Sequence, residues 1–340
     1  MAVTIKDVAR LANVAPSTVS RVIANSPRIS EETKRKVKKA MEELRYHPNL
    51  NARSLASQST QTIGIVMPSS GDAVFQNPFF PSVLQGISEG AREKNYALHM
   101  TTGKLEKETL EAVIHMVQGK RVDGLILLNS KVEDKVISYL RKMDFPFVII
   151  GKPSKHVEEI THVDNDNVRA MREATEYLID HGHRDIAFIG GSLELMVTVD
   201  RLHGYKQALK NANIPIKNEY ILHEEFRREG GQEAVSELMA LAQRPTSLVV
   251  VDDFMALGVL STLNELGIKV PEEISVVSFN NVLLAELSNP PLTSVDINIF
   301  GLGYQASKSL IQKIENNNEP TKRIIISHKL VERLSCSEPS

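Results

Sequence analysis

Short apolar runs alternate with amphipathic stretches from residue 62 onward. The runs are of the length and continuity expected for strands buried on both faces, at Ile63–Met67, Gly124–Leu128 and Phe147–Ile150. Apolar residues at helical spacing fill Phe80–Lys94, Lys107–Gln118 and Lys135–Lys142, and a further strand is expected at Leu98–Thr101. This alternation predicts a parallel, doubly wound sheet with helices on both faces.

The same alternation restarts after about residue 161. Helices are expected over Arg169–His181, 202–212, 230–242 and 254–266, and strands over Ile186–Gly190, Tyr220–His223, Ser247–Val251 and Val276–Phe279. The sequence therefore predicts two similar α/β lobes. Ligands of such sheets bind beyond the carboxyl ends of the strands, so we expect the binding site in a cleft between the lobes.

The first 46 residues show a different pattern, made of short helices alone. Ile5–Ala12 and Pro16–Ala24 are expected to be helices, and Thr4 can cap the first of them. A third helix begins after Ser30 and ends ahead of Pro48, because proline disfavours helix at the residue before it. Two short helices joined by a tight turn predict a helix-turn-helix, whose second helix enters the major groove of DNA.

Charge is distributed unevenly along the chain. The first 60 residues hold 11 Lys/Arg and 5 Asp/Glu, whereas the remaining 280 hold 29 and 37. A small basic part joined to a larger acidic part is expected when only the basic part meets a polyanion. The alternative is a basic surface that contacts only solvent, and charge alone does not distinguish the two interpretations.

Composition excludes several classes of protein. The single cysteine, Cys336, excludes a disulfide framework and a cysteine-built metal site. No apolar run reaches the roughly 20 residues that span a bilayer, and the N-terminus lacks the apolar core of a signal peptide. We therefore expect a cytoplasmic protein without membrane contact.

The first 60 residues resemble the LacI/GalR family of bacterial transcription regulators. The matching stretches are Thr4–Ala9, Val14–Val22, Tyr46–Asn49 and Ala52–Ala56. One departure is Ala15, where the family usually has a serine that caps the reading helix; loss of such a cap costs about 1 kcal/mol of local stability. Several matching stretches in the same order along the chain are far more specific to a family than a single short motif.

The resemblance implies a set of DNA contacts. Pro16, Ser17 and Arg21 would face base edges, with Arg21 placed for a bidentate contact to guanine. Residues expected at phosphates or in the hinge that follows are Thr4, Thr18, Ser20, Asn25, Asn49, Ala52, Arg53, Leu55 and Ala56. Leu55 would wedge between base pairs in the minor groove and kink the site. Because two hinges must meet at that wedge, a homodimer on a near-palindromic operator follows.

The remainder of the chain resembles the periplasmic-binding-protein fold that this family carries behind its DNA-binding domain. The expected organisation is therefore an all-α helix-turn-helix domain over 1–46, a hinge and linker over 47–61, and a two-lobed effector-binding and dimerisation domain over 62–340. Chain crossings are expected near 161, 291 and 324. They would divide the body into a lobe N of about 62–160 plus 292–323 and a lobe C of about 161–291 plus 324–340.

Seven residues are expected to bind the effector. Arg201 aligns with the family's effector-binding arginine, and its planar fork of donors suits neighbouring hydroxyls. Asp252 and Asn280 occupy positions where relatives often have asparagine and aspartate, so the resemblance implies that the acidic acceptor has moved from one loop to the other. The others are Phe79, Phe80, Asp164 and Phe226. The alternatives are that Phe79 and Phe80 belong to the core, and that Arg201 forms a surface salt bridge.

Together these patterns predict a repressor of a sugar-utilisation operon that is neither an enzyme nor cofactor-dependent. Asn77–Phe80 and Phe279–Asn281 most resemble the maltose-operon repressors of Gram-positive bacteria, so maltose is the preferred effector and relief of repression the preferred response. The alternatives are a sugar-metabolising enzyme on an α/β scaffold, and a relative that responds to a purine or a phosphosugar. His181 and His183 suggest a metal pair only superficially, because they lie where a helix ends and a strand begins.

Overall fold

The structure is a computed structural model that describes residues 3–23, 26, 28–46, 59–68, 75–103, 105–128 and 130–339. Residue contacts divide the chain into two units, a head of residues 1–60 and a body of residues 61–340. Each unit has its own apolar core. The two are described separately below.

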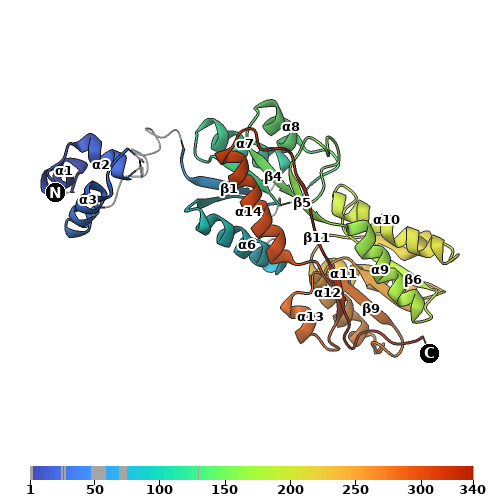
Figure 1. The fold of residues 1–340 in the computed structure, drawn as a ribbon. Helices are drawn as coiled ribbons and strands as arrows, with labels where there is room; N and C mark the ends of the chain where they lie inside the picture. The colour runs from blue at the N-terminus through green and yellow to red at the C-terminus, as the bar shows by residue number, and fades with distance from the viewer. Residues whose placement is uncertain are drawn as a thin grey trace. The chain divides into compact units, whose positions relative to one another are not determined.

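The described part of the head contains the helices α1 (Ile5–Leu11), α2 (Pro16–Ile23) and α3 (Glu31–Glu43). Their core is built from the apolar residues that the helical spacing predicts, among them Val8, Val19, Val22 and Val37. α1 begins where expected, because the backbone N–H of Thr4 donates to the carboxylate of Asp7 over 2.9 Å. The helix-turn-helix prediction is confirmed (Figure 1).

Lobe N is built on a six-stranded sheet in the order β11-β5-β4-β3-β1-β2, with every pairing parallel. Its strands are β1 (Thr62–Val66), β2 (Ala97–Thr101), β3 (Gly124–Leu127), β4 (Phe147–Ile150), β5 (His162–Asn165) and β11 (Arg323–Ile326). Its helices are α6 (Phe79–Glu93), α7 (Glu106–Gln118), α8 (Lys135–Lys142) and α14 (Ile299–Glu315). Although α6 and α14 are far apart in sequence, they pack side by side (Figure 1).

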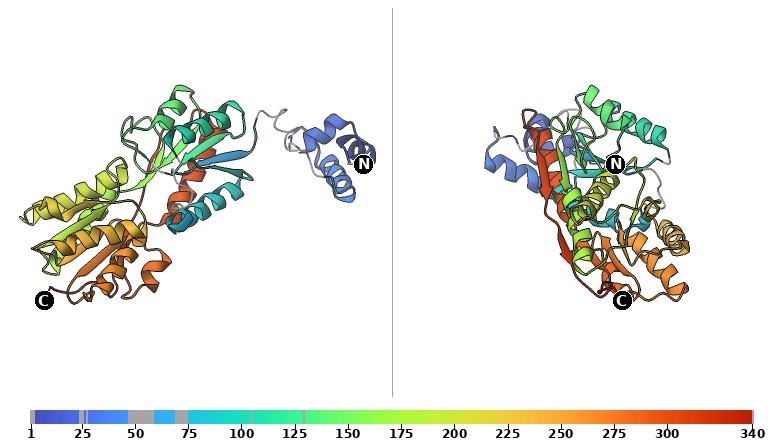
Figure 2. Two further views of the ribbon diagram at one scale, coloured as in Figure 1. Left: turned by 180° about the vertical axis from the view of Figure 1, so that it is seen from behind. Right: turned by 90° about the vertical axis from the view of Figure 1, so that its right-hand side faces the viewer.

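Lobe C has a second six-stranded sheet in the order β12-β10-β9-β8-β6-β7, in which only β12 is antiparallel. Its strands are β6 (Ile186–Gly190), β7 (Ile221–His223), β8 (Ser247–Val250), β9 (Ser275–Phe279), β10 (Thr293–Asp296) and β12 (Lys329–Val331). Its helices are α9 (Asn167–Asp180), α10 (Met196–Asn211), η1 (Asn218–Tyr220), α11 (Arg228–Ala240), α12 (Asp253–Glu265) and α13 (Leu283–Leu287). Helices α9 and α10 pack together, as do α11 and α12 (Figure 2).

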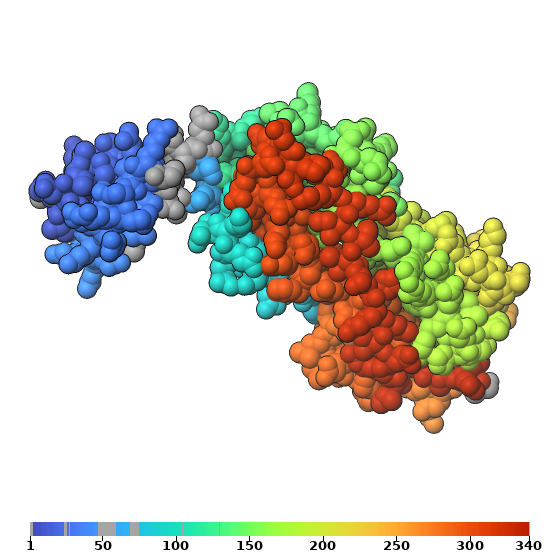
Figure 3. All heavy atoms as spheres, viewed as in Figure 1, coloured from blue at the N-terminus to red at the C-terminus, as the bar shows by residue number. Residues whose placement is uncertain are grey.

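The chain passes between the lobes after β5, after β10 and after β11. The crossings expected near 161 and 291 lie just ahead of β5 and β10, whereas the chain crosses only after each of these strands ends. The crossing expected near 324 falls inside β11. Thus β5 and β11 belong to lobe N and β10 to lobe C, because β5 pairs with both β4 and β11 while β10 pairs with β9. The residues that follow β10, drawn in orange-red to red, therefore cover part of both lobes, with α14 and β11 on lobe N and β12 on lobe C (Figure 3).

Candidate functional site

A cavity of about 590 Å³ lies between the two lobes of the body. Its walls come from loops at the carboxyl ends of strands in both sheets, as expected for this class of fold. All seven residues expected at the effector site line it: Phe79, Phe80, Asp164, Arg201, Phe226, Asp252 and Asn280. The structure therefore brings together side chains that are up to two hundred residues apart in sequence.

Asp252 links the two lobes at one end of the cavity. It caps α12, because one carboxylate oxygen accepts from the backbone N–H groups of Phe254 and Met255 over 2.8 and 3.2 Å. The other oxygen accepts from the side-chain amides of Asn77 in lobe N and Asn280 in lobe C, over 3.0 and 2.7 Å. Burial raises the pKa of Asp252, and these hydrogen bonds oppose that shift. The result is a fixed, buried acceptor cluster.

Arg201 is 4% exposed, so the alternative of a surface salt bridge is wrong. Its Nε donates to the side-chain oxygen of Asn167 over 2.9 Å, and its Nη1 donates to the carbonyl of Val251. Its guanidinium lies 4.4 Å from the centre of the Phe279 ring. Burial lowers the pKa of Arg201 to about 10, and Asp252 and Asp164 oppose the shift, so it remains a cation at neutral pH. The hydrogen bonds to Asn167 and Val251 use the one hydrogen of Nε and one of the two on Nη1, so the second hydrogen of Nη1 and both hydrogens of Nη2 can meet a ligand.

Asp164 lies at the end of β5, where the chain first leaves lobe N. One of its oxygens accepts from the side-chain amide of Asn167 over 3.0 Å. Burial raises the pKa of Asp164 to about 7, and the nearby charge of Asp200 contributes in the same direction. This carboxyl group is therefore poised between its acid and its anion at neutral pH.

Three aromatic side chains give the cavity apolar faces. The rings of Phe79 and Phe80 meet edge to face with their centroids 5.2 Å apart. Both residues are half-buried, and both line the cavity as well as packing against the core. Phe226 lies over Gly191, where any side chain would put its Cβ 2.2 Å from the phenylalanine ring. These faces suit the apolar side of a sugar ring or of a base.

Other polar residues that line the cavity did not belong to the expected set. Four of them contact expected residues or one another: Asn77, Lys152, Asn167 and Asp200. Lys152 of lobe N forms an ion pair with Asp200 of lobe C over 3.3 Å, so the pair spans the cavity between the lobes. Asn77 and Lys152 lie in loops that follow the apolar strands β1 and β4, so attention to every such loop could have found them. Asn167 follows β5, which has no apolar run to mark it.

The expected base-contacting residues lie on an exposed face of the head. Pro16, Ser17 and Arg21 of α2 are exposed. Of the expected phosphate contacts, Ser20 and Thr4 are exposed and Thr18 is half-buried. The hydroxyl of Thr4 donates to Asp7 over 2.7 Å. The remaining expected contacts, Asn25, Asn49, Ala52, Arg53, Leu55 and Ala56, lie outside the described residues.

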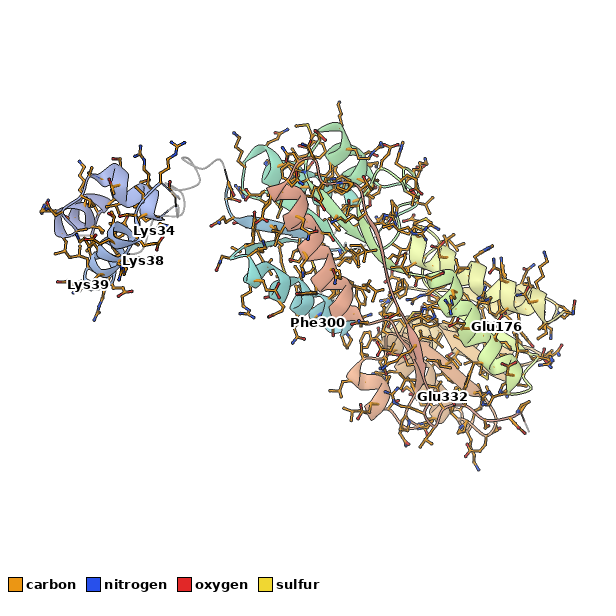
Figure 4. The ribbon with its side chains drawn as sticks, viewed as in Figure 1. Lys34, Lys38, Lys39, Glu176, Phe300 and Glu332 are labelled. Atoms are coloured by element: carbon orange, nitrogen blue, oxygen red, sulfur yellow. The ribbon has the colours of Figure 1, made fainter. Side chains whose placement is uncertain are left out.

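The third helix adds basic side chains to the head. Lys38 and Lys39 of α3 are exposed, whereas Lys34 is half-buried and paired with Glu31 over 2.7 Å (Figure 4). These lysines are three of the 11 basic side chains in the first 60 residues. Positive charge on a helix-turn-helix favours association with a phosphate backbone.

The His181 and His183 side chains have structural roles. The ring of His183 is buried and lies within 3.0 Å of the hydroxyls of Thr246 and Ser275. The Nδ1 of His181 lies 2.8 Å from the carbonyl of Tyr177 one helical turn earlier. Within the described ranges no three His, Cys, Asp or Glu residues are grouped to hold a metal ion, and no helix is long and apolar enough to cross a bilayer.

Comparison with known families matches both parts of the chain. Residues 4–49 match the family described as bacterial regulatory proteins, lacI family, and residues 175–336 match a periplasmic binding protein-like domain. The HTH-type transcriptional regulator MalR of Streptococcus pneumoniae serotype 4 is 47% identical over 340 residues. That alignment covers 98% of this chain and 100% of the relative.

The chain is also similar to solved structures of transcriptional regulators. A LacI transcriptional regulator from Bacillus cereus subsp. cytotoxis is 53% identical, with a TM-score of 0.80, over 82% of this chain and 98% of that one. A complex of the transcriptional regulator CelR with cellobiose is 30% identical, with a TM-score of 0.78, over 98% of this chain and 99% of that one. Both similarities extend across the lobes that form the cavity.

Proposed function

The chain belongs to the lacI family of bacterial regulatory proteins, and from this premise we propose that it represses an operon for the use of a neutral disaccharide, with maltose as its effector. It is a DNA-binding transcription regulator, as its relatives are, and they are named as regulators rather than enzymes. A repressor of a bacterial operon acts where the chromosome lies, so we place this one in the cytoplasm. The observation that carries the effector proposal is the buried cluster of Arg201 and Asp252 between the lobes.

The charge of the cavity favours a neutral ligand over a phosphorylated one. Four cations line the cavity, Lys131, Lys152, Arg201 and Arg227, against five acidic residues, Asp164, Glu194, Asp200, Glu225 and Asp252. Lys152 is paired with Asp200 and Arg227 with Glu225, while Arg201 lies in the fields of Asp252 and Asp164 and Lys131 in that of Asp134. A phosphate group needs unpaired cations or a row of free backbone N–H groups. A sugar needs donors and acceptors for its hydroxyls, together with a flat apolar face, and Arg201, Asn280 and Phe226 offer these. The cellobiose complex of CelR adds support, because cellobiose is itself a neutral disaccharide.

We further propose that the protein acts as a homodimer on a pseudo-palindromic operator. A single helix-turn-helix reads one half-site, and a twofold-symmetric pair reads two. On α13, Leu283 and Leu287 are 66% and 68% exposed and lie one helical turn apart, so they form a contiguous apolar patch of the kind that meets another protein. In the dimer, each hinge over 47–61 would insert its Leu55 into the minor groove.

Control by the effector would work through the relative position of the lobes. A ligand that binds between them favours the arrangement in which both sets of contacts are made. If operator DNA favours a different arrangement, the ligand weakens DNA binding and DNA equally weakens ligand binding. Maltose would in this way separate the paired hinges and relieve repression.

The proposal is tested by thermal denaturation and calorimetric titration of the full chain with maltose, glucose, maltose phosphate and adenine. Maltose should raise the melting temperature most, because a ligand at 100 times its Kd adds about 2.7 kcal/mol to stability. Maltose should also release a bound operator fragment from the protein. A larger shift with maltose phosphate or adenine would contradict a neutral-sugar effector.

Replacing Arg21 by alanine should relax operator selectivity. A bidentate arginine–guanine contact contributes about 1–3 kcal/mol of discrimination, so preference at one base pair should fall roughly 5- to 150-fold. A binding-site selection with the purified chain measures this. The matched control is Arg35→Ala on the exposed surface of α3, which should weaken binding evenly across sequences. Unchanged selectivity in Arg21→Ala would remove Arg21 from the base-reading set.

A further inference from the structure

The side-chain amide of Asn165 touches the chain at all three of its passages between the lobes. Asn165 is the last residue of β5, where the first passage begins. Its Nδ2 donates to the carbonyl of Ile297, in the second passage, over 3.0 Å. The same nitrogen donates to the carbonyl of Ile326, where the third passage begins, over 2.9 Å. One buried amide therefore ties together three segments that are 132 and 161 residues away in sequence.

The chemistry of this position requires asparagine. An amide nitrogen carries two hydrogens, and here each can meet one carbonyl. Ile297 directly follows β10 and Ile326 is the last residue of β11, where a backbone carbonyl leaves the regular ladder and needs another donor. Aspartate has the same shape but cannot donate when ionised, and leucine has a similar size but no donor. The side chain of Asn165 is buried, so water is a poor substitute for the amide.

Asn165 is also connected to the arginine of the cavity. Asn167 donates to the carboxylate of Asp164 over 3.0 Å and accepts from the Nε of Arg201 over 2.9 Å. Its amide also lies 3.4 Å from the backbone carbonyl of Asn165. A continuous set of hydrogen bonds therefore runs from Arg201, through Asn167, to the residue that joins the three passages.

We propose that Asn165 is a positioning residue that makes the three interlobe passages act as one hinge and so couples effector binding to operator release. Without it, the passages bend independently, and a ligand in the cavity no longer fixes a single lobe arrangement. The effect on DNA rests on the proposed function. The effect on lobe motion does not depend on which effector is used.

The first test measures the distance between the lobes in the absence of any effector. Spin labels on Lys142→Cys in lobe N and Lys210→Cys in lobe C report it, since both lysines are exposed. The native Cys336 is half-buried and burial raises the pKa of its thiol to about 11, so the introduced thiols react first. Labelled chain is mixed with excess unlabelled chain, so that a dimer holds at most one labelled copy.

Asn165→Leu should broaden the distribution of distances, and Asn165→Ser, which keeps one donor, should have an intermediate effect. The matched control is Asn264→Leu, which makes the same chemical change on the exposed surface of α12. A distribution in both Asn165 variants that equals those of the parent and of Asn264→Leu would overturn the proposal. The serine variant decides the question if the leucine variant does not fold.

The second test measures operator affinity with and without maltose. In Asn165→Leu the ratio of the two affinities should fall roughly 2- to 30-fold toward unity, while operator affinity without maltose is retained. A merely structural role would lower both affinities and leave their ratio unchanged, which would contradict coupling. If the parent chain does not respond to maltose, the proposed effector is wrong, and the distance measurement still decides the role of Asn165.

Discussion

Replacing Arg201 by alanine is expected to abolish the proposed response of this repressor to maltose while leaving operator binding intact. The guanidinium is buried in the cavity and held in one orientation by Asn167, Val251 and the Phe279 ring. A hydrogen bond to a charged group contributes about 1.5–3 kcal/mol, so the loss of even one should weaken maltose binding roughly 10- to 150-fold. Calorimetric titration of maltose measures the loss.

Two comparisons make this result interpretable. Arg244→Ala removes an exposed arginine from the same lobe and should leave maltose binding unchanged. Operator binding by Arg201→Ala, measured without effector, reports on the head, which is a separate unit with its own core. The melting temperature of the variant, measured beside it, reports whether the body is folded. Parent-like maltose affinity in Arg201→Ala would exclude Arg201 from the effector site.

Replacing Asp253 by alanine is expected to destabilise the body more than any change at the cavity surface. Asp253 is completely buried and accepts hydrogen bonds from the hydroxyls of Ser278 and Ser294 and from the backbone N–H of Val282. It therefore joins α12, β9, β10 and the loop that leads to α13. Each of the three stranded donors costs about 1–3 kcal/mol, so the total loss should be about 3–9 kcal/mol. At about 2–4 °C per kcal/mol for a large unit, that corresponds to a fall of roughly 6–36 °C in Tm.

The control for this prediction is Asp180→Ala, an exposed aspartate at the end of α9, which should change Tm by little. Differential scanning calorimetry of the two variants and the parent gives the comparison. Burial raises the pKa of Asp253 to about 7, so the scans belong at one fixed pH. A similar Tm for both variants would show that the hydrogen bonds of Asp253 do not contribute to the stability of lobe C.

Asp252 and Asp253 show that residue type alone cannot predict which side chain lies at the cavity. They are adjacent and chemically identical, yet Asp252 caps α12 at the cavity while Asp253 lies in the interior of lobe C. Resemblance to a family selected Asp252 in advance. No local property of the sequence separates the two, because a helix turns by about 100° per residue and the packing of the whole lobe decides which direction is interior.

The interlobe passages show a second limit. β5 is completely buried although three of its four residues, His162, Asp164 and Asn165, are polar. It therefore lacks the apolar run that marked β1, β3 and β4, and the expected crossing was placed ahead of it. Hydrogen bonds to distant groups, such as those from Asn165 to Ile297 and Ile326, make such a strand tolerable in the interior.

The sequence by itself determined the helix-turn-helix, the two α/β lobes and the loops that border the cleft. Apolar periodicity, helix caps and breaks are interactions between near neighbours, so they can be recognised without knowing the fold. Tertiary structure alone decided that Asn77 meets Asp252, that Lys152 meets Asp200 and that Asn165 joins three passages. Those contacts depend on how two sheets are packed and connected, and residues so far apart in the chain carry no local trace of their pairing.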